Sequence, residues 1–433
     1  MPSMTPPSSP MQLSLHTGHD SKSISHTSTS GSSLTPPVTP IGKESSERIV
    51  TPLSEPSDEH SAALFRRNIT TPLRFTDELE PCLDERGRRI EFGEGVWSKV
   101  YKARSTPNTN PATTTTNNLL NTPPSSPINA SRVVAVKTSR RGDAGPVLKT
   151  EALILTRLTL TPGHENHIVP FHGFHAETQS LVMTAVPLAL STYIEEAANR
   201  VRNQPIATAT MFDPFLGPEP WKDLARKLIS SLGWLHHTAG IMHGDVKPHS
   251  ILLRPIEVAE GQDRNSNGRN AFRYEPLLAD FSAAMDISPG PAENGNEEKI
   301  LSSFTAPFSA PEVLKSLRPG SGNPPPGPAS DVFSLAATLL AAATGDVLLY
   351  PGCDFRRRNL MAGEGHQILD FIRSFGNGAR VPRNGFVERL VRPAVVKDPA
   401  QRITAIEWVG LAEEMELKEG SEEHTYQPEI NEG

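Results

Sequence analysis

Cysteine is scarce in this sequence: Cys82 and Cys353 are the only two among 433 residues, and they lie far apart without CxxC spacing. Structural zinc sites and disulfide-stapled folds depend on several cysteines at short, regular spacing. The sequence therefore offers no cysteine zinc site. The same scarcity favours a reducing compartment, so we expect the protein in the cytoplasm, the nucleus or both.

Long basic runs are also missing. Lysine and arginine total 42 against 49 acidic residues, which gives a formal net charge of −7. Proteins that bind nucleic acid usually show clustered positive charge. We therefore expect no nucleic-acid partner, and any phosphate-binding role must come from a local site.

No apolar run has the length and purity of a membrane span. The most apolar stretch, Val332 to Tyr350, is interrupted by Gly345 and Asp346. The N-terminal residues MPSMTPPSSP lack the charged and then apolar order of a secretory signal. We predict a buried core helix that ends near Gly345, and no membrane partner.

Large apolar residues are few near the N-terminus, where Ser, Thr and Pro dominate. Such a segment cannot bury enough surface to offset its ordering entropy, so residues 1–75 are predicted to be a disordered tail. Composition also predicts a low-complexity insertion at 105–131, a polar insertion at 256–274 and an acidic tail at 417–433. Ser-Pro and Thr-Pro pairs recur in the first tail and the first insertion, as candidate sites for proline-directed kinases or as a by-product of composition: Thr5, Ser9, Thr35, Thr39, Thr51, Thr71, Thr106, Thr122 and Ser126.

The remaining framework changes its periodicity along the chain. Residues 76–186 contain β-branched and alternating runs such as RVVAVK and SLVMTAV, with one helical pattern, TEALILTRL, between them. Residues 187–416 are mostly helical in pattern. This order predicts an α+β fold with a small β-rich lobe followed by a larger α-helical lobe.

Two segments of the first lobe carry groups that could bind phosphate. Gly93 and Gly95 lie in FGEGVWSKV, a glycine turn whose backbone could approach phosphate oxygens, although glycine hairpins are more often turns alone. Lys137 ends the strand VVAVK and is either a solvent-seeking lysine or a point charge for a phosphate. Glu151, on the helical run, is either an exposed glutamate or the partner of Lys137.

Two aspartates of the second lobe end short strand-like runs. Asp245 occurs in HGDVKP and Asp280 in LLADFS. Such residues often only form turns. With Lys137 they could instead serve phosphoryl transfer, where Asp245 would orient an attacking hydroxyl and Asp280 would hold magnesium.

The order of these motifs resembles the eukaryotic protein kinase family, serine/threonine type. The glycine loop, VAVK, a helix glutamate, HGDVK, DFS and SAPE follow one another in the family's order across about Ile90 to Glu416. The resemblance implies a bilobal fold, ATP and Mg²⁺, with Mn²⁺ as an alternative, and a protein substrate.

The resemblance also implies a role for each matching position. Val100 and Ala135 would enclose adenine, Thr184 to Val186 would bind it through their backbone, and Met183 would lie behind it. Lys137 would contact the phosphates and pair with Glu151, while Lys247 would neutralise the transferred group. His243 and Asp331 would support the catalytic loop. Arg402, in the segment that begins at Asp398, would pair with Glu312.

Several positions depart from the family pattern. Ser250 stands where the family has a metal-binding asparagine, so we predict weaker magnesium binding, which Ser250→Asn should improve. Gly244 replaces an arginine that, in many members, pairs with a phosphorylated activation segment. We therefore predict activity that survives alanine replacement of Ser288, Ser302, Ser303 and Thr305. Ser98 and Ser282 replace glycines and restrict only backbone freedom.

Two functions of different class remain open from sequence. One is a working serine/threonine kinase, favoured because Lys137, Asp245, Lys247 and Asp280 are all present. The other is a pseudokinase that acts as a nucleotide-binding or scaffolding module. GEGVWSKVY with HGDVKP has a weak likeness to fungal kinases that activate cyclin-dependent kinases, which makes a cyclin-dependent kinase a candidate substrate. The oligomeric state is left open.

Overall fold

The computed structural model describes residues 69–95, 97–107, 131–203, 210–256, 272–287, 305–316 and 326–425. All of them lie in one unit, Ser57–Gly433. Most of the predicted N-terminal tail and the greater part of both predicted insertions lie outside the described residues. The same holds for Ser288, Ser302 and Ser303.

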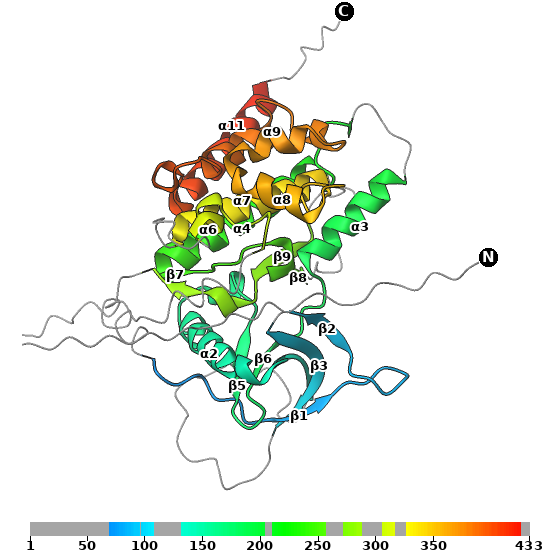
Figure 1. Cartoon of the computed structure of the whole chain (residues 1–433), viewed down its shortest axis with the longest axis vertical. Helices are drawn as coiled ribbons and strands as arrows, with labels where there is room; N and C mark the ends of the chain where they lie inside the picture. The colour runs from blue at the N-terminus through cyan, green and yellow to red at the C-terminus, as the bar shows by residue number, and fades with distance from the viewer. Residues whose placement is uncertain are drawn as a thin grey trace, which may run out of the picture. The chain divides into compact units, whose positions relative to one another are not determined.

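The first lobe is built on a six-stranded sheet in the order β1-β3-β4-β6-β5, with β2 paired to β3 (Figure 1). Its neighbouring strands are antiparallel. The strands are β1 Glu78–Pro81, β2 Glu91–Glu94, β3 Ser98–Thr106, β4 Arg132–Ser139, β5 Phe171–His175 and β6 Ser180–Thr184. Lys137 therefore sits in a central strand.

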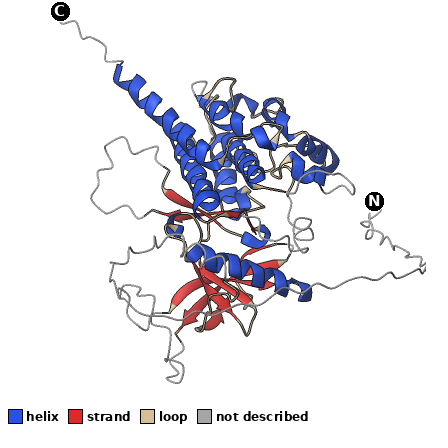
Figure 2. Ribbon diagram, turned by 90° about the vertical axis from the view of Figure 1, so that its left-hand side faces the viewer, coloured by secondary structure: helices blue, strands red, loops and turns tan. Residues whose placement is uncertain are grey.

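Burial explains why β4 is central. Val134 and Val136 of its RVVAVK run are fully buried, and β-branched side chains suit a pleated, buried surface. The helix α2, Gly145–Thr159, carries Pro146 in its first turn and buries Leu148, Leu155 and Leu158. It packs against β5 and β6 (Figure 2). The predicted helical run is thereby confirmed, and Glu151 is brought beside the sheet.

The second lobe is helical, as predicted, with short strands near its chemistry-bearing loops. Its helices are α3 Leu190–Arg202, α4 Pro218–Gly233, α6 Pro311–Ser316, α7 Pro328–Thr344, α8 Phe355–Gly363, α9 Ile368–Arg373, α10 Phe386–Val391 and α11 Ala405–Thr425. Its strands form two antiparallel pairs, β7 Ile241–Met242 with β10 Met285–Asp286, and β8 Ile251–Pro255 with β9 Tyr274–Leu278. The catalytic-loop sequence lies between β7 and β8.

The helix α7 is the buried helix that the sequence predicts. Every residue from Ser330 to Thr344 is buried, and the helix ends at Gly345, which adopts the left-handed conformation that suits glycine. Trp221 of α4 donates its indole N–H to the carbonyl of Leu339 in this helix. Among the helices of the described ranges, none combines the length and apolarity of a membrane span.

The predicted domain boundaries differ from the structure by a few residues at four places. Leu73 to Phe75, assigned to the tail, pack along β5, and Phe75 is buried. Ser105, assigned to the first insertion, is buried in β3 and donates a hydrogen bond to Asp77. Phe272 of the second insertion is buried as well, and α11 continues to Thr425, past the boundary predicted at 417. Composition does not reveal the edges at Phe75, Ser105 and Phe272 because they are fixed by contacts with distant segments.

Candidate active site

Lys137 joins the two lobes by contacting two carboxylates. The lysine is 4% exposed, and its Nζ lies 2.7 and 2.8 Å from the two carboxylate oxygens of Glu151 and 2.7 Å from Oδ1 of Asp280. Burial alone would lower the pKa of Lys137, but the two carboxylates raise it well above its usual value. The lysine is therefore charged, and its side chain is held at the junction of the lobes.

Glu151 also contacts the segment that follows Asp280. Its Oε1 also accepts a hydrogen bond from the backbone N–H of Phe281, at 3.1 Å. The Phe281 ring is buried beside the imidazole of His243. Burial raises the pKa of Glu151, and the Lys137 ammonium limits that rise. The pairing of Lys137 with Glu151, predicted from sequence, is present, and it extends to the segment that follows Asp280.

Asp280 has the geometry of a residue held for function. Its φ is +62°, a left-handed conformation that non-glycine residues rarely adopt. The Ser282 hydroxyl donates to Oδ1 at 2.9 Å, so this serine supports the aspartate that it follows. Burial would raise the pKa of Asp280, but Lys137 and Ser282 lower it far below its usual value. The carboxylate is thus ionised while its side chain stays 45% exposed.

These contacts fit a magnesium ion that is held partly by the protein. Mg²⁺ commonly binds through one or two carboxylates, several waters and substrate phosphates. The partly exposed, ionised Asp280 supplies one such carboxylate. Among the described residues, no group of three or more His, Cys, Asp and Glu could hold a metal by itself. The donor set therefore suits a metal that arrives with a nucleotide.

The catalytic loop brings Asp245, Lys247 and Thr305 together. The ammonium of Lys247 is hydrogen-bonded to Asp245 Oδ2 and lies 2.9 Å from the Thr305 hydroxyl, which donates to Asp245 Oδ1 at 3.1 Å. Burial raises the pKa of Asp245 above its ordinary value, and Lys247 counteracts this. A carboxylate with a raised pKa, oriented by two donors, suits the acceptance of a proton from a hydroxyl.

Ser250 is buried, and its hydroxyl is hydrogen-bonded within the catalytic loop. The residue is 1% exposed, and its hydroxyl accepts from the backbone N–H of Lys247 at 3.0 Å. The single proton of the hydroxyl is shared between two carbonyl oxygens, that of Asp245 at 2.9 Å and that of Lys247 at 3.0 Å. A hydroxyl has a single proton and two lone pairs, so these contacts use nearly all its capacity. Ser250 therefore braces the loop, and its assignment as a metal ligand stays a prediction.

His243 and Asp331 also brace the catalytic loop, as the resemblance implies. Asp331 accepts from the backbone N–H of His243 at 2.6 Å and from that of Gly244 at 2.9 Å. The His243 ring accepts from the N–H of Asp245 and donates to the carbonyl of Ala279 at 3.0 Å. One imidazole thus connects the backbone at Asp245 to that beside Asp280, which sets the spacing of the two aspartates.

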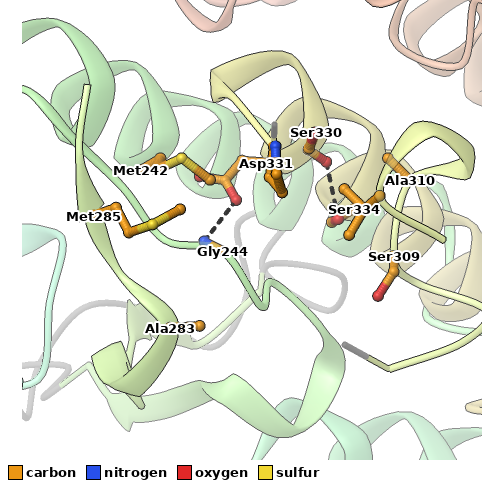
Figure 3. Close-up of a pocket in the computed structure, with 11 residues that line it drawn as sticks. Met242, Gly244, Ala283, Met285, Ser309, Ala310, Ser330, Asp331 and Ser334 are labelled. Atoms are coloured by element: carbon orange, nitrogen blue, oxygen red, sulfur yellow. Dashed lines mark hydrogen bonds between the residues drawn. The ribbon is translucent and has the colours of Figure 1, made fainter. Parts of the chain in front are cut away.

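Gly244 is required by the backbone at this point. Its φ is +82°, and a Cβ placed there would lie 2.5 Å from the carbonyl oxygen of Ala283. Figure 3 shows its N–H directed at Asp331, with Met242 and Met285 to the left in this view. The cavity beside these residues has a volume of about 20 Å³, room for about one water molecule. The position that holds arginine in many kinases cannot carry a side chain in this conformation.

The residues assigned to the nucleotide lie around β2, β3, β4 and β6. Val100 in β3 is opposite Gly93 in β2, while Ala135 in β4 is opposite Met183 in β6. Gly95 follows β2, and its N–H donates to the carbonyl of Ser98.

The predicted backbone contacts with adenine concern Thr184 to Val186. The N–H of Thr184 donates to the carbonyl of Pro170 at 2.9 Å, which excludes its N–H but not its carbonyl as a contact with the base. Its hydroxyl lies 3.1 Å from the His172 ring. Val186, which is buried, remains a candidate for a backbone contact with the base.

Glu312 and Arg402 form the ion pair that the resemblance implies. The Arg402 side chain is fully buried, and its Nη1 and Nη2 lie 2.7 and 3.1 Å from the two oxygens of Glu312. Arg402 also donates to the carbonyls of Ala329 and Val396. This pair ties α6, which follows the activation segment, to the helices of the second lobe.

Three contributors were missed by sequence reasoning. Thr305 was treated only as a candidate phosphorylation site, Ser282 only as a loss of glycine, and His236 was not considered. His236 donates to Asp331 at 2.9 Å. Serine, threonine and histidine are common in any chain, so a single sequence gives no signal that distinguishes these positions.

Comparison with known proteins identifies the family. The protein kinase domain family matches residues 127–411, about two thirds of the chain, and the chain belongs to this family. The matched range includes Lys137, Glu151, Asp245 and Asp280. The resemblance predicted from the order of motifs is therefore confirmed, together with the bilobal α+β fold.

Several curated relatives are serine/threonine-protein kinases by name. Serine/threonine-protein kinase ISR1 of Saccharomyces cerevisiae is 25% identical over 66% of this chain and 60% of its own length. Serine/threonine-protein kinase PKZ1 of Phytophthora infestans is 31% identical over 42% of each chain. PknK of Mycobacterium tuberculosis is 33% identical over 30% of this chain and 9% of its own length. The chain thus spans 60% or less of each of these relatives.

Proposed function

We propose that the protein is a serine/threonine kinase that transfers the γ-phosphoryl group of ATP to a hydroxyl of a protein substrate. The observation that carries this proposal is the double ion pair of Lys137 with Glu151 and Asp280. This arrangement places a buried cation beside an ionised, partly exposed carboxylate at the junction of the lobes. Phosphoryl transfer depends mainly on such positioning and electrostatic stabilisation.

The chain's own residues divide the work of this reaction. Lys137, aimed by Glu151, would bind phosphate oxygens of ATP, and Asp280 would hold Mg²⁺, which supplies charge neutralisation on those phosphates. Asp245 would orient the substrate hydroxyl and accept its proton. Lys247, held by Thr305 and Asp245, would balance negative charge on the group in transfer. Mn²⁺ is an alternative ion because oxygen ligands also suit it.

The direct test is phosphotransfer by the purified full chain from labelled ATP to itself and to a degenerate serine and threonine peptide library. Mg²⁺ and Mn²⁺ are compared, beside Asp245→Asn. Asp370→Asn is the matched control, because Asp370 is an exposed aspartate on α9, outside the site. We expect transfer by the wild type and by Asp370→Asn, with a loss of at least a hundredfold in Asp245→Asn. Equal signals from all three proteins would refute the proposal.

A pseudokinase remains a second candidate because of Ser250. Ser250 stands where the family has a metal-binding asparagine, and its hydroxyl is already hydrogen-bonded to the loop backbone. In this alternative the chain binds nucleotide and recruits partners without transfer. Nucleotide binding, measured by fluorescence, with no phosphotransfer under either metal would favour it.

A narrower hypothesis concerns the substrate. The weak likeness of GEGVWSKVY and HGDVKP to fungal activating kinases supports a cyclin-dependent kinase as a candidate substrate, in the cytoplasm, the nucleus or both. Assay of the activation-segment peptide of a cyclin-dependent kinase against a threonine-to-alanine version of it tests this. A rate no higher than that of unrelated library peptides would reject the hypothesis and leave the general activity standing.

A further inference from the structure

A second ion pair connects α2 to the segment that follows Asp280. Nη1 and Nη2 of Arg157 lie 2.5 and 2.6 Å from the two carboxylate oxygens of Asp286, a bidentate pair. The Arg157 side chain is 10% exposed and that of Asp286 is 43% exposed. Bidentate pairs of this kind fix direction as well as distance. The contact therefore constrains how the end of α2 lies against β10.

The partner strand of this contact is attached to the catalytic loop. Asp286 is in β10, which pairs with β7 at Ile241 and Met242, and the N–H of Ile287 donates to the carbonyl of Gly240. Ile241 and Met242 are buried and directly precede His243 and the loop. Arg157 thus reaches the catalytic loop through a paired strand and not through a free segment.

Two anchors on one helix determine its orientation. Glu151 fixes α2 to Lys137 and to the N–H of Phe281, and Arg157 fixes it again six residues later. Six residues correspond to about 9 Å along a helix axis. A helix held at one point can pivot about that point, whereas a second anchor about 1.7 turns away prevents this.

We propose that the Arg157–Asp286 ion pair positions α2 for phosphoryl transfer and so keeps Glu151 aligned on Lys137. Both residues are positioning residues, since neither contacts the reacting groups. Gly244 carries no side chain that could hold this segment from the catalytic-loop side. Fixed charges that the chain itself carries therefore provide the attachment without added phosphate. This proposal rests on the proposed kinase function for its effect on activity, but not for its effect on the helix.

The test is a double-mutant cycle of Arg157→Gln, Asp286→Asn and the double variant, with Glu414→Gln as the control. Glu414 forms an exposed ion pair with Lys418 on α11, so its loss removes one surface pair elsewhere. Hydrogen exchange across residues 145–159 is measured with the apparent KM for ATP and kcat. We expect each single variant to lose about tenfold in kcat/KM, with faster exchange in α2, while the control changes neither.

The double-mutant cycle also distinguishes loss of the ion pair from loss of side-chain packing. If the ion pair acts as a unit, the double variant loses no more than the worse single variant. Additive losses, or wild-type exchange in α2 of Asp286→Asn, would overturn the proposal. If the wild type transfers no phosphate, the kinase function fails, and hydrogen exchange alone decides the helix anchor. Faster exchange in the variants then supports it, and unchanged exchange refutes it.

Discussion

Replacement of Thr305 gives the sharpest check on how the catalytic loop is organised. Its hydroxyl donates to Asp245 at 3.1 Å and accepts from Lys247 at 2.9 Å. Thr305→Ala removes both contacts, while Thr305→Ser keeps the hydroxyl. Hydrogen bonds to charged groups contribute about 1.5–3 kcal/mol each. Water in a partly buried site replaces some of this, so we expect a net loss of about 1.5–3 kcal/mol in transition-state stabilisation.

That loss corresponds to a roughly tenfold to hundredfold fall in kcat/KM. Steady-state phosphotransfer measures it, with thermal melting to show that the variants fold. Thr305→Ser should lie within about threefold of the wild type, whereas Thr305→Asp should be as poor as Thr305→Ala because it adds a second negative charge beside Asp245. A fully active Thr305→Ala, or an active Thr305→Asp, would refute this reasoning.

The contacts of Thr305 change what an alanine scan of the activation segment would show. A loss of activity at Thr305 would report its contact with Asp245 and Lys247 and not a missing phosphate. The prediction of phosphorylation-independent activity therefore applies to Ser288, Ser302 and Ser303 only.

Three further predictions follow from other contacts. Arg402→Met leaves the Glu312 carboxylate, whose side chain is 11% exposed, without its charged partner. We expect a loss of about 3 kcal/mol in unfolding free energy, seen as a melting temperature lower by about 6 °C or more, and an unchanged melting temperature would contradict this. Burial, with Arg132 nearby, lowers the pKa of His172 from 6.5 to about 4, so its contribution to stability is complete above pH 6.5 and is lost as the pH falls toward 4. Melting curves at pH 7.5 and 4.5 should therefore differ less in His172→Gln than in the wild type, and equal differences would count against this. Ser250→Ala should lower kcat, because its hydroxyl braces the loop, and a wild-type kcat would contradict this. A raised magnesium requirement in the same variant would support its predicted role as a metal ligand.

Much of the site was predictable because its chemistry depends on residues that are unusual in their setting. A lysine at the end of a buried strand and aspartates in HGDVKP and LLADFS stand out against the apolar runs around them. The order of these motifs along the chain then indicated the protein kinase family, since each motif alone is common. The fold class followed from the change of periodicity near residue 186.

What the sequence alone determined is therefore the fold class, the family and the identity of the charged groups, because periodicity and motif order are properties of the chain itself. The partners of the other polar and charged residues became visible only in the folded structure. Ser250 turned toward the loop backbone, Thr305 met Asp245 from 60 residues away, and Arg157 met Asp286 from 129 residues away. The physical reason is that a hydrogen bond or an ion pair depends on distances of about 3 Å, which are set by packing between distant segments.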